Sequence, residues 1–310
     1  MIRDALRSVA RNEALGDLVG RAPGAREVVK RVVGGETLDS ALEVAVHLTD
    51  RGFWASLERA APTIESEDDA ERVTADYAAL ISGVVSAGLA DGCEVTVFPE
   101  ALGLGAGGQV DVDGIARERL TRLAERAAAG RVALMVGMGP AAEADVTLNW
   151  AEDLWAAGLP VGLTLAAAFR RTEADCARLA HRRIRLVKGA YRGDPGAAHS
   201  QPIEIDKAFV RCAKRLLAGD GEPSFATHDS RLVEIVQSLS RRYERPRHTY
   251  EFAFFMGRQE GAQERLLADG ERVRVYIPYG PDWFERLVGG LAEQPSSIAA
   301  AVRSLLPGVS

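Results

Sequence analysis

The chain has 310 residues, of which 47% are hydrophobic and 26% are charged, and 44 acidic side chains outnumber 38 basic ones for a formal net charge of -6. This composition is typical of a folded globular protein and excludes disorder over most of the chain. A mildly acidic chain without a dense Lys/Arg run lacks the charge that binding to phosphate backbones requires. We therefore expect no nucleic-acid partner.

The cysteines and the start of the chain indicate where the protein works. Cys93, Cys176 and Cys212 are odd in number and far apart, so we expect neither a disulfide framework nor a metal site. No run of about 18 uncharged apolar residues is present, and residues 1–11 carry charges instead of a signal-peptide core. These features predict a cytoplasmic protein without a membrane span.

Short apolar runs rich in β-branched residues alternate along the chain with longer segments of helical periodicity. This alternation is typical of repeated strand–helix units that build a parallel sheet. The predicted strands are, in chain order, 52–57, 94–98, 131–136, 160–166, 184–189, 224–228, 249–254 and 273–278.

The segments between these strands have apolar residues at helical spacing. Eight strand–helix units in about 260 residues are what an α/β (β/α)8 barrel of the TIM type requires, whereas an open doubly wound sheet more often has five or six strands. We therefore predict a barrel. The predicted helices include 67–85, 115–128, 143–157, 172–181, 203–218 and 231–242.

The segment before the first strand also has helical periodicity, with apolar stripes in 28–33 and 38–48. No linker of Pro and Ser and no low-complexity tract interrupts the chain. We predict a single domain, 1–310, in which an N-terminal helical extension, 1–49, caps a barrel formed by 50–310.

In such barrels the chemistry lies at the C-terminal ends of the strands. The fifth predicted strand carries Arg185 and ends in Lys188 and Gly189. A buried Arg is costly unless an anionic or polar group pairs with it. It either clamps a phosphate or an electron-rich ring, or forms an ion pair with a carboxylate of a neighbouring strand; the spacing favours neither.

Three further strand ends supply candidates. His228 ends the sixth predicted strand, where a barrel displays ligands, although a lone His there is more often a hydrogen-bonded wall residue. Asp229 is a predicted N-cap for the next helix. Glu251 is at least as well explained by an ion pair as by a site role, and Gly280 permits a sharp turn toward Trp283.

Two other patterns are weaker. Gly103, Gly105 and Gly108 match a dinucleotide fingerprint in spacing, but a glycine-rich barrel loop explains them better, because no open βαβ unit surrounds them. Lys188 is a candidate for a Schiff base, since buried lysines with a lowered pKa act in this way. That reading predicts an aldolase or lyase.

Five strings in the chain resemble the motifs of the proline dehydrogenase family, in the same order and spacing. The string RLVKGAY at 185–191 resembles the family's fifth-strand motif. The others are GETL at 35–38, FRRTEAD at 169–175, ATHD at 226–229, and VRVYIPYG at 273–280 with Trp283. The resemblance extends from about residue 30 to 305.

The resemblance implies an FAD-bearing (β/α)8 barrel that oxidises proline to pyrroline-5-carboxylate by hydride transfer to flavin N5. It implies that Arg185 lies beside N5 and acts in catalysis with Lys188. The implied cofactor contacts are Arg185, Lys188, Gly189, Thr227, His228 and Glu293. The implied substrate pocket contains Glu58, Phe98, Met135, Tyr191, Tyr279 and Arg286.

The departures from the family pattern fall on positions that contact substrate or flavin in the family. Gly289 and Gly290 replace the arginine pair that holds the proline carboxylate bidentately, and Arg286 replaces a tyrosine. Phe98 follows the second strand where the family has a lysine. Other polar positions of the family are occupied by Met135, Ala166, Ala168, Ala253, Met256, Ala61 and Pro62.

The predicted function is a flavin-dependent oxidoreductase of proline metabolism that acts on L-proline or a related cyclic amine or amino acid. The predicted substrate is a small molecule; a peripheral contact with an electron acceptor and the oligomeric state stay open. The alternative is a degenerate family member that acts as a binding or regulatory protein, because so many site residues have changed together. The Schiff-base lyase remains a third hypothesis.

Overall fold

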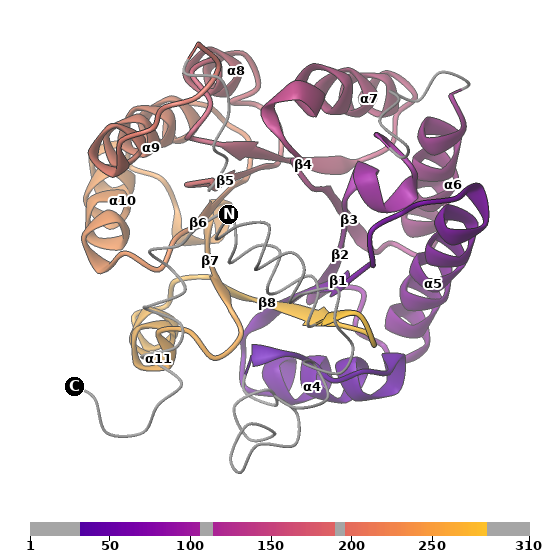
Figure 1. Ribbon diagram of the computed structural model, residues 1–310. Helices are drawn as coiled ribbons and strands as arrows, with labels where there is room; N and C mark the ends of the chain where they lie inside the picture. Colours follow the sequence, from indigo (N-terminus) through magenta and orange to yellow (C-terminus); the bar gives the residue numbers. More distant parts are fainter. Residues whose placement is uncertain (1–31, 106–113, 190–195, 284–310) are drawn as a thin grey trace, which may run out of the picture.

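Eight parallel strands form a closed barrel in which each strand pairs with the next in sequence and the last pairs with the first (Figure 1). The structure is a computed structural model that describes residues 32–105, 114–189 and 196–283. Each predicted strand overlaps an observed one, so the predicted barrel is confirmed. The strands are β1 Trp54–Arg59, β2 Cys93–Val97, β3 Ala133–Val136, β4 Val161–Ala166, β5 Ile184–Val187, β6 Pro223–Ala226, β7 Glu251–Phe255 and β8 Val273–Tyr279.

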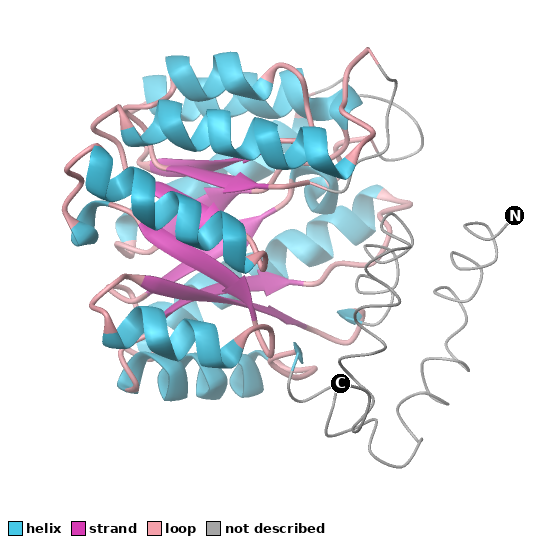
Figure 2. Cartoon of the chain, turned by 90° about the vertical axis from the view of Figure 1, so that its left-hand side faces the viewer, coloured by secondary structure: helices cyan, strands magenta, loops and turns pink. Residues whose placement is uncertain are grey.

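Helices surround the barrel on its outer side (Figures 1 and 2). All six predicted crossover helices are present, and the short helix α11 is an addition that the periodicity did not single out. The helices are α4 Leu38–Asp50, α5 Glu67–Ser86, α6 Ile115–Ala129, α7 Ala144–Ala156, α8 Thr172–Arg178, α9 Pro202–Leu217, α10 Ser230–Arg242 and α11 Glu260–Ala268. Short 3-10 turns, Pro99–Leu102 and Ala141–Glu143, follow β2 and β3.

Local sequence signals explain where the helices begin. At the start of α5, the Ser66 side chain accepts a hydrogen bond from the Asp69 backbone N–H, and at the start of α10 Asp229 does the same for Arg231. The predicted cap at Asp229 is therefore present. Buried positions recur every three or four residues along α5, so one face packs on the sheet.

The strands alternate between an outer apolar face and an inner face that is partly polar. The register fixes which residues of neighbouring strands lie side by side. Ser56 pairs with Glu94, Thr164 with Arg185 and Ala253 with Arg274. Successive side chains of a strand point to opposite faces. On each of these strands, every second residue counted from the paired one therefore also faces the barrel interior. The outer positions form the main hydrophobic core with the helices.

An ionic network fills the part of the barrel interior that lies nearer the N-terminal ends of the strands. Glu251 accepts two hydrogen bonds from Arg274, at 2.8 and 2.9 Å, and Arg274 also donates to the Ala55 carbonyl at 2.7 Å. Burial by itself raises the pKa of Glu251, but the charges of Arg274 and Arg183 outweigh it and hold that pKa well below its ordinary value. Glu251 is therefore a structural carboxylate, one of the two roles that the sequence left open.

The helix α4 lies on the outside of the barrel, beside β8 and β1 (Figure 1). It is the part of the predicted N-terminal extension that the structure describes; residues 1–31 lie outside the described ranges. Its position closes the ring of helices at the seam where β8 pairs with β1.

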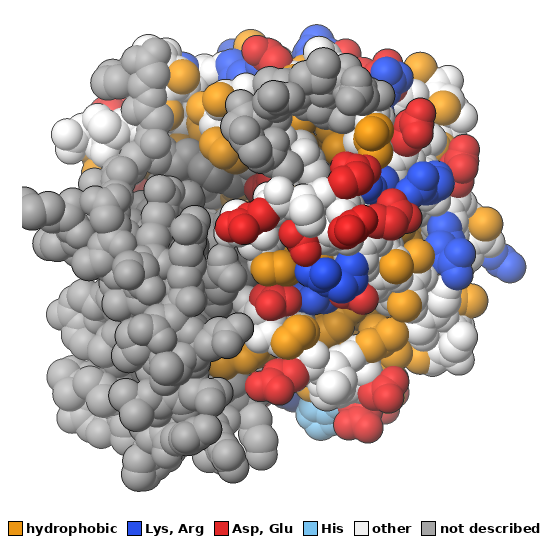
Figure 3. Space-filling model, turned by 45° about the vertical axis from the view of Figure 1, so that its right-hand side comes forward, with side chains coloured by type: hydrophobic (Ala, Val, Ile, Leu, Met, Phe, Trp, Pro, Cys, Tyr) orange, Lys and Arg blue, Asp and Glu red, His pale blue; other side chains and the backbone are white. Residues whose placement is uncertain are grey.

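The face that carries α5 and α6 shows acidic and basic side chains interleaved (Figure 3). Arg119 and Arg122 on α6 pair with Glu71 on α5, and Arg117 pairs with Asp153. This face has charges of both signs in contact with each other, and not a continuous basic surface. In the described ranges, no helix combines the length and the apolar character that crossing a bilayer requires.

Candidate active site

The C-terminal ends of the strands surround one end of the barrel, called the mouth below. Extending the register by alternation places one residue of each strand end on the inner wall. These inner residues are mostly apolar, and the two polar ones are a carboxylate and an imidazole. They are Glu58, Phe98, Gly137, Ala166, Val187, His228, Phe255 and Pro278.

Arg185 lies inside the barrel, below the mouth, and is 3% exposed. Its Nη2 donates to Glu94 on β2, and its Nη1 donates to Thr96 Oγ1 at 3.1 Å. Its guanidinium carbon lies 5.8 Å from the centre of the Tyr276 ring. One of the two sequence hypotheses for Arg185 was an ion pair with a carboxylate of a neighbouring strand. An ion pair is observed, but its carboxylate belongs to β2, which faces β5 across the barrel and is not next to it.

Glu94 is the partner that the sequence analysis missed. Its carboxylate is fully buried and also accepts from Arg183 at 2.7 Å and from Ser56 Oγ at 2.8 Å. Burial lowers the pKa of Arg185 to about 10, so Arg185 remains a cation at neutral pH. The available signal was the alternation in CEVTV, which places Glu94 and Thr96 on the same face of β2.

Glu58 and Tyr276 form a second polar pair nearer the mouth. The Tyr276 hydroxyl donates to Glu58 Oε2 at 2.5 Å, and Glu58 is 4% exposed. The Tyr276 ring packs edge-on against the Phe255 ring, with 5.0 Å between the ring centres. A predicted pocket residue, Glu58, thus contacts Tyr276, and Tyr276 in turn contacts Phe255; the sequence analysis singled out neither aromatic residue.

His228 lies at the mouth among aromatic side chains. Its ring centre is 6.0 Å from that of Phe254 and 5.6 Å from that of Phe255, which is 52% exposed. Burial, together with the charge of Arg258, lowers the pKa of His228 to about 4. The imidazole is therefore neutral at physiological pH, and within the described chain its Nδ1 is buried without a hydrogen-bond partner.

Lys188 and Thr227 follow β5 and β6 but lie on the helix side of the strand ends. Lys188 Nζ lies 2.5 Å from Asp206 on α9 and 3.9 Å from Asp229. Thr227 is buried, and its Oγ1 accepts from the Asp229 backbone N–H at 3.2 Å. Gly189 follows Lys188 with a φ of +75°, a conformation that favours glycine.

The remaining described pocket candidates differ in where they lie. Phe98 is at the mouth, where a Cβ added at Gly137 would lie 2.5 Å from its ring. Met135 is fully buried inside the barrel, against Gly162. Tyr279 is 4% exposed, and by alternation it points to the helix side, so it lies away from the inner wall.

Comparisons with known proteins agree with this architecture. The family model described as proline dehydrogenase matches residues 41–283. The chain belongs to the proline dehydrogenase family. Its function is accordingly that of a proline dehydrogenase-like oxidoreductase of the flavin-dependent kind, and the resemblance inferred from the sequence is confirmed.

Several members of the family align with nearly the whole chain. Proline dehydrogenase 2 of Bacillus subtilis is 25% identical over 284 residues, which are 91% of each chain. Proline dehydrogenase 1 of the same organism is 25% identical over 308 residues, or 99% of each chain. Proline dehydrogenase of Deinococcus radiodurans is 27% identical over 285 residues, or 91% of each chain.

Solved structures show the same fold. Proline utilization A from Bdellovibrio bacteriovorus, inactivated by N-propargylglycine, superposes on 96% of this chain with a TM-score of 0.79 at 19% identity. A mutant of proline utilization A from Bradyrhizobium japonicum gives a TM-score of 0.72 at 24% identity over the same share. The chain spans 37% and 35% of these longer proteins.

Some candidates named from the family resemblance lie outside the described ranges. These are Tyr191, Arg286 and Glu293, together with the departures Gly289 and Gly290. Their predicted roles stay predictions.

Polar atoms inside the barrel test whether a flavin fits this member of the family. Arg185 Nε and His228 Nδ1 are both buried and, in the described part of the chain, both lack a hydrogen-bond partner. Buried polar groups are nearly always paired, so two such atoms on the inner wall are available to a ligand with polar ring atoms. The exposed Phe255 ring supplies an apolar surface beside them. The residues present fit a flat heteroaromatic ring.

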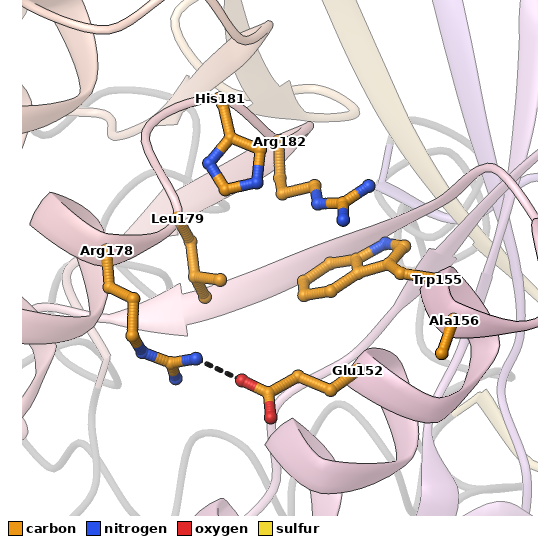
Figure 4. Close-up of a pocket in the computed structure, with 7 residues that line it drawn as sticks. All are labelled: Glu152, Trp155, Ala156, Arg178, Leu179, His181 and Arg182. Carbon is orange, nitrogen blue, oxygen red and sulfur yellow. Dashed lines mark hydrogen bonds and ion pairs between the residues drawn. The ribbon is translucent and has the colours of Figure 1, made fainter.

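A separate cavity of about 290 Å³ is lined by residues of α7 and by residues at and just after the end of α8 (Figure 4). The Arg182 guanidinium lies over the Trp155 ring, 4.9 Å from its centre, and Arg178 pairs with Glu152. Trp155 Nε1 donates to the carbonyl of Val161, the first residue of β4. None of the site candidates lines this cavity, so it belongs to the scaffold and not to the mouth.

Proposed function

We propose that this chain binds FAD at the barrel mouth and oxidises proline or a related cyclic amine there. The observation that carries the proposal is the pair of buried polar atoms, Arg185 Nε and His228 Nδ1, left without partners on the inner wall. Membership of the proline dehydrogenase family supports the flavin, and the mouth of a (β/α)8 barrel is where such chemistry is expected.

The residues proposed to hold the cofactor are Arg185 and His228 on the inner wall, with Lys188, Gly189 and Thr227 at the ends of β5 and β6. Glu293 is a proposed contact outside the described ranges. A bound flavin supplies a two-electron acceptor that takes a hydride from the carbon next to the substrate nitrogen. The protein contributes the binding surface, the orientation and the electrostatics.

Two electrostatic features support this role. Arg185 is a buried cation, and a fixed positive charge in a dry site stabilises negative charge that develops nearby. His228 is neutral at physiological pH, because its pKa is about 4, so its ring can pack beside an apolar ligand without the cost of burying a charge. These two residues are the proposed contacts to the reacting part of the cofactor.

The structure offers less support for the Schiff-base alternative. Lys188 lies 2.5 Å from the Asp206 carboxylate and faces α9, not the barrel interior. A Schiff base requires an amine that reaches a substrate carbonyl inside the barrel, and the Lys188 amine is directed away from that space. The hypothesis of a degenerate, non-catalytic member gains no support from the comparisons.

The test is the absorption spectrum of freshly purified protein, followed by anaerobic addition of cyclic amines. We expect flavin bands that bleach when the amine is added. We expect Arg185→Lys, which keeps the charge but not the planar fork, to slow bleaching by about a hundredfold. Arg126→Lys on the outer surface is the matched control. A colourless protein that takes up no added FAD would contradict the proposal.

A further inference from the structure

Four buried side chains inside the barrel form a closed ring of hydrogen bonds. Each is at most 3% exposed, and they come from three strands: Ser56 from β1, Glu94 and Thr96 from β2, and Arg185 from β5. Arg185 Nη2 donates to Glu94 Oε1, and Arg185 Nη1 donates to Thr96 Oγ1 at 3.1 Å. Ser56 Oγ lies 2.8 Å from Glu94 Oε1 and 2.9 Å from Thr96 Oγ1, which closes the ring.

The direction of each hydrogen bond in this ring follows from counting protons. The Glu94 carboxylate also accepts from Arg183 at 2.7 Å, and a carboxylate paired with two arginines accepts hydrogen bonds without donating any. Ser56 therefore gives its single hydroxyl proton to Glu94. Because that proton is used, the Thr96 hydroxyl donates to Ser56, and a lone pair of Thr96 Oγ1 accepts from Arg185. Both hydroxyl groups thus have one fixed orientation.

The ring fixes the plane of the Arg185 guanidinium. A single hydrogen bond to Glu94 would hold one terminal nitrogen and leave the group free to turn about it. The second bond, to Thr96, removes that rotation, so the direction of the Nε–H is set as well. Nε is buried, has no hydrogen-bond partner in the described part of the chain, and is the Arg185 atom proposed above to meet the flavin.

We propose that Thr96 and Ser56 are positioning residues, which orient the Arg185 guanidinium toward the cofactor through their hydroxyl groups. The inference rests on the proposed function, because only under that proposal does Arg185 contact a flavin. Glu94 differs from the two hydroxyls in that it balances the charge of Arg185, whereas they are neutral and determine only its direction. Direction matters because the effect of a cation on nearby charge in a dry site depends on its being held in place beforehand.

A purely structural role of the two hydroxyls is the competing explanation. Buried hydroxyl groups are nearly always paired, so the loss of one lowers stability whatever happens to Arg185. The measurements that separate the two explanations therefore report on the guanidinium and on the flavin, and not on stability or turnover.

The test compares Thr96→Val, which keeps the branched shape without the hydroxyl, with Thr96→Ser, which keeps the hydroxyl. Thr74→Val is the matched control, because Thr74 is also buried and its hydroxyl donates to the Ala70 carbonyl within α5, outside the barrel. Ser56→Ala is a second site variant, which removes the acceptor of the Thr96 hydroxyl and keeps the inference testable if Thr96→Val does not fold.

The first measurement is the midpoint potential of the FAD-loaded protein. A well-placed cation stabilises the negative charge of reduced flavin, so a misdirected one favours reduced flavin less. We expect Thr96→Val to lower the binding preference for reduced over oxidised FAD by about tenfold, which is a potential lower by about 30 mV for a two-electron couple. Ser56→Ala should shift the potential in the same direction, whereas Thr96→Ser and Thr74→Val should keep the parent's value.

The second measurement needs no flavin. The Nε–H signal of Arg185 in the proton–nitrogen NMR correlation spectrum of the flavin-free protein is assigned by its loss in Arg185→Lys. We expect Thr96→Val and Ser56→Ala to shift this signal and to speed its exchange with solvent by about tenfold. Thr96→Ser and Thr74→Val should leave it in place.

The two measurements together distinguish failure of this inference from failure of the proposed function. A shifted Arg185 signal in a protein that takes up no FAD would support the orientation of Arg185 by Thr96 and overturn the proposed function. In a protein that does bind FAD, a potential that Thr96→Val leaves unchanged, with only stability lost, would overturn the inference and keep the proposed function.

Discussion

At the scale of single residues, Arg185 shows how one buried side chain joins stability to chemistry. Its two terminal nitrogens are bonded to Glu94 and Thr96, while its Nε has no partner within the described chain. Two of its nitrogens therefore hold the guanidinium in place, and the third, Nε, remains available to a ligand. Thr96 and Ser56 complete the arrangement through a 2.9 Å contact between their hydroxyl groups.

His228 makes stability depend on pH. Its pKa is about 4 in the folded protein, because burial and the charge of Arg258 disfavour the cation, and about 6.5 in the unfolded chain. Between these values the unfolded chain binds a proton that the folded chain does not. Stability is therefore complete above about pH 6.5 and is lost as the pH falls toward about 4.

We expect the free energy of unfolding to fall by about 2 kcal/mol more in the parent than in His228→Phe when the pH goes from about 7.5 to about 5. Urea titrations of the flavin-free protein at both pH values measure this difference. His47→Gln, on the exposed side of α4, is the control and should keep the parent's pH dependence. An equal loss in the parent and in His228→Phe would refute the role of His228.

At the scale of the elements, α4 is fixed by its first turn. Thr37 Oγ1 accepts from the Ser40 backbone N–H at 3.3 Å, and Ser40 Oγ accepts from the Thr37 backbone N–H at 3.3 Å. This reciprocal pair is a capping box in which serine takes the place of the usual Glu or Gln. Because α4 packs on β1 and β8, the stability of its first turn affects the place where these two strands pair.

We expect Thr37→Ala to lower the free energy of unfolding by about 1 kcal/mol, because the Ser40 backbone N–H loses its side-chain partner. Chemical denaturation followed by far-ultraviolet circular dichroism measures the change. Thr121→Ala on α6 is the matched control, since the Thr121 hydroxyl donates to the carbonyl of Arg117 within its own helix. If both variants lose the same stability, the capping box contributes nothing specific.

At the scale of the whole molecule, one side chain connects the strands on both sides of the barrel seam. Arg274 belongs to β8, donates twice to Glu251 on β7, and donates once to the Ala55 carbonyl on β1. It is 1% exposed, so its charge and that of Glu251 are balanced within the protein and not by water. The pair therefore adds side-chain contacts to the backbone pairing that joins β8 to β1.

We expect Arg274→Met to lower the free energy of unfolding by about 3 to 5 kcal/mol, because the Glu251 carboxylate is left buried without its bidentate partner. The double variant Arg274→Met/Glu251→Met should recover a large part of this loss, since it removes both charges. Denaturant titrations measure both, with Arg265→Met on the exposed side of α11 as the control. A double variant less stable than the single one would contradict the argument.

Much of the fold could be predicted from the sequence, because strand and helix positions depend on local periodicity. The run 160–166, for example, differs from β4 by one residue at its start. The helix α11 was not singled out because it has nine residues and only two buried positions, Gln263 and Leu266. A pattern that short does not establish a helical period. The position of Tyr276 inside the barrel required the register between β7 and β8.

The sequence by itself determined the number and order of the strands, the family, and which residue types stand at the strand ends. Only the tertiary structure decided what those residues contact. Arg185 and Glu94 are 91 positions apart, and they meet because barrel closure brings β2 and β5 to face each other across the interior. Local periodicity specifies which face a side chain is on, but its partner on a distant strand depends on how the whole sheet closes.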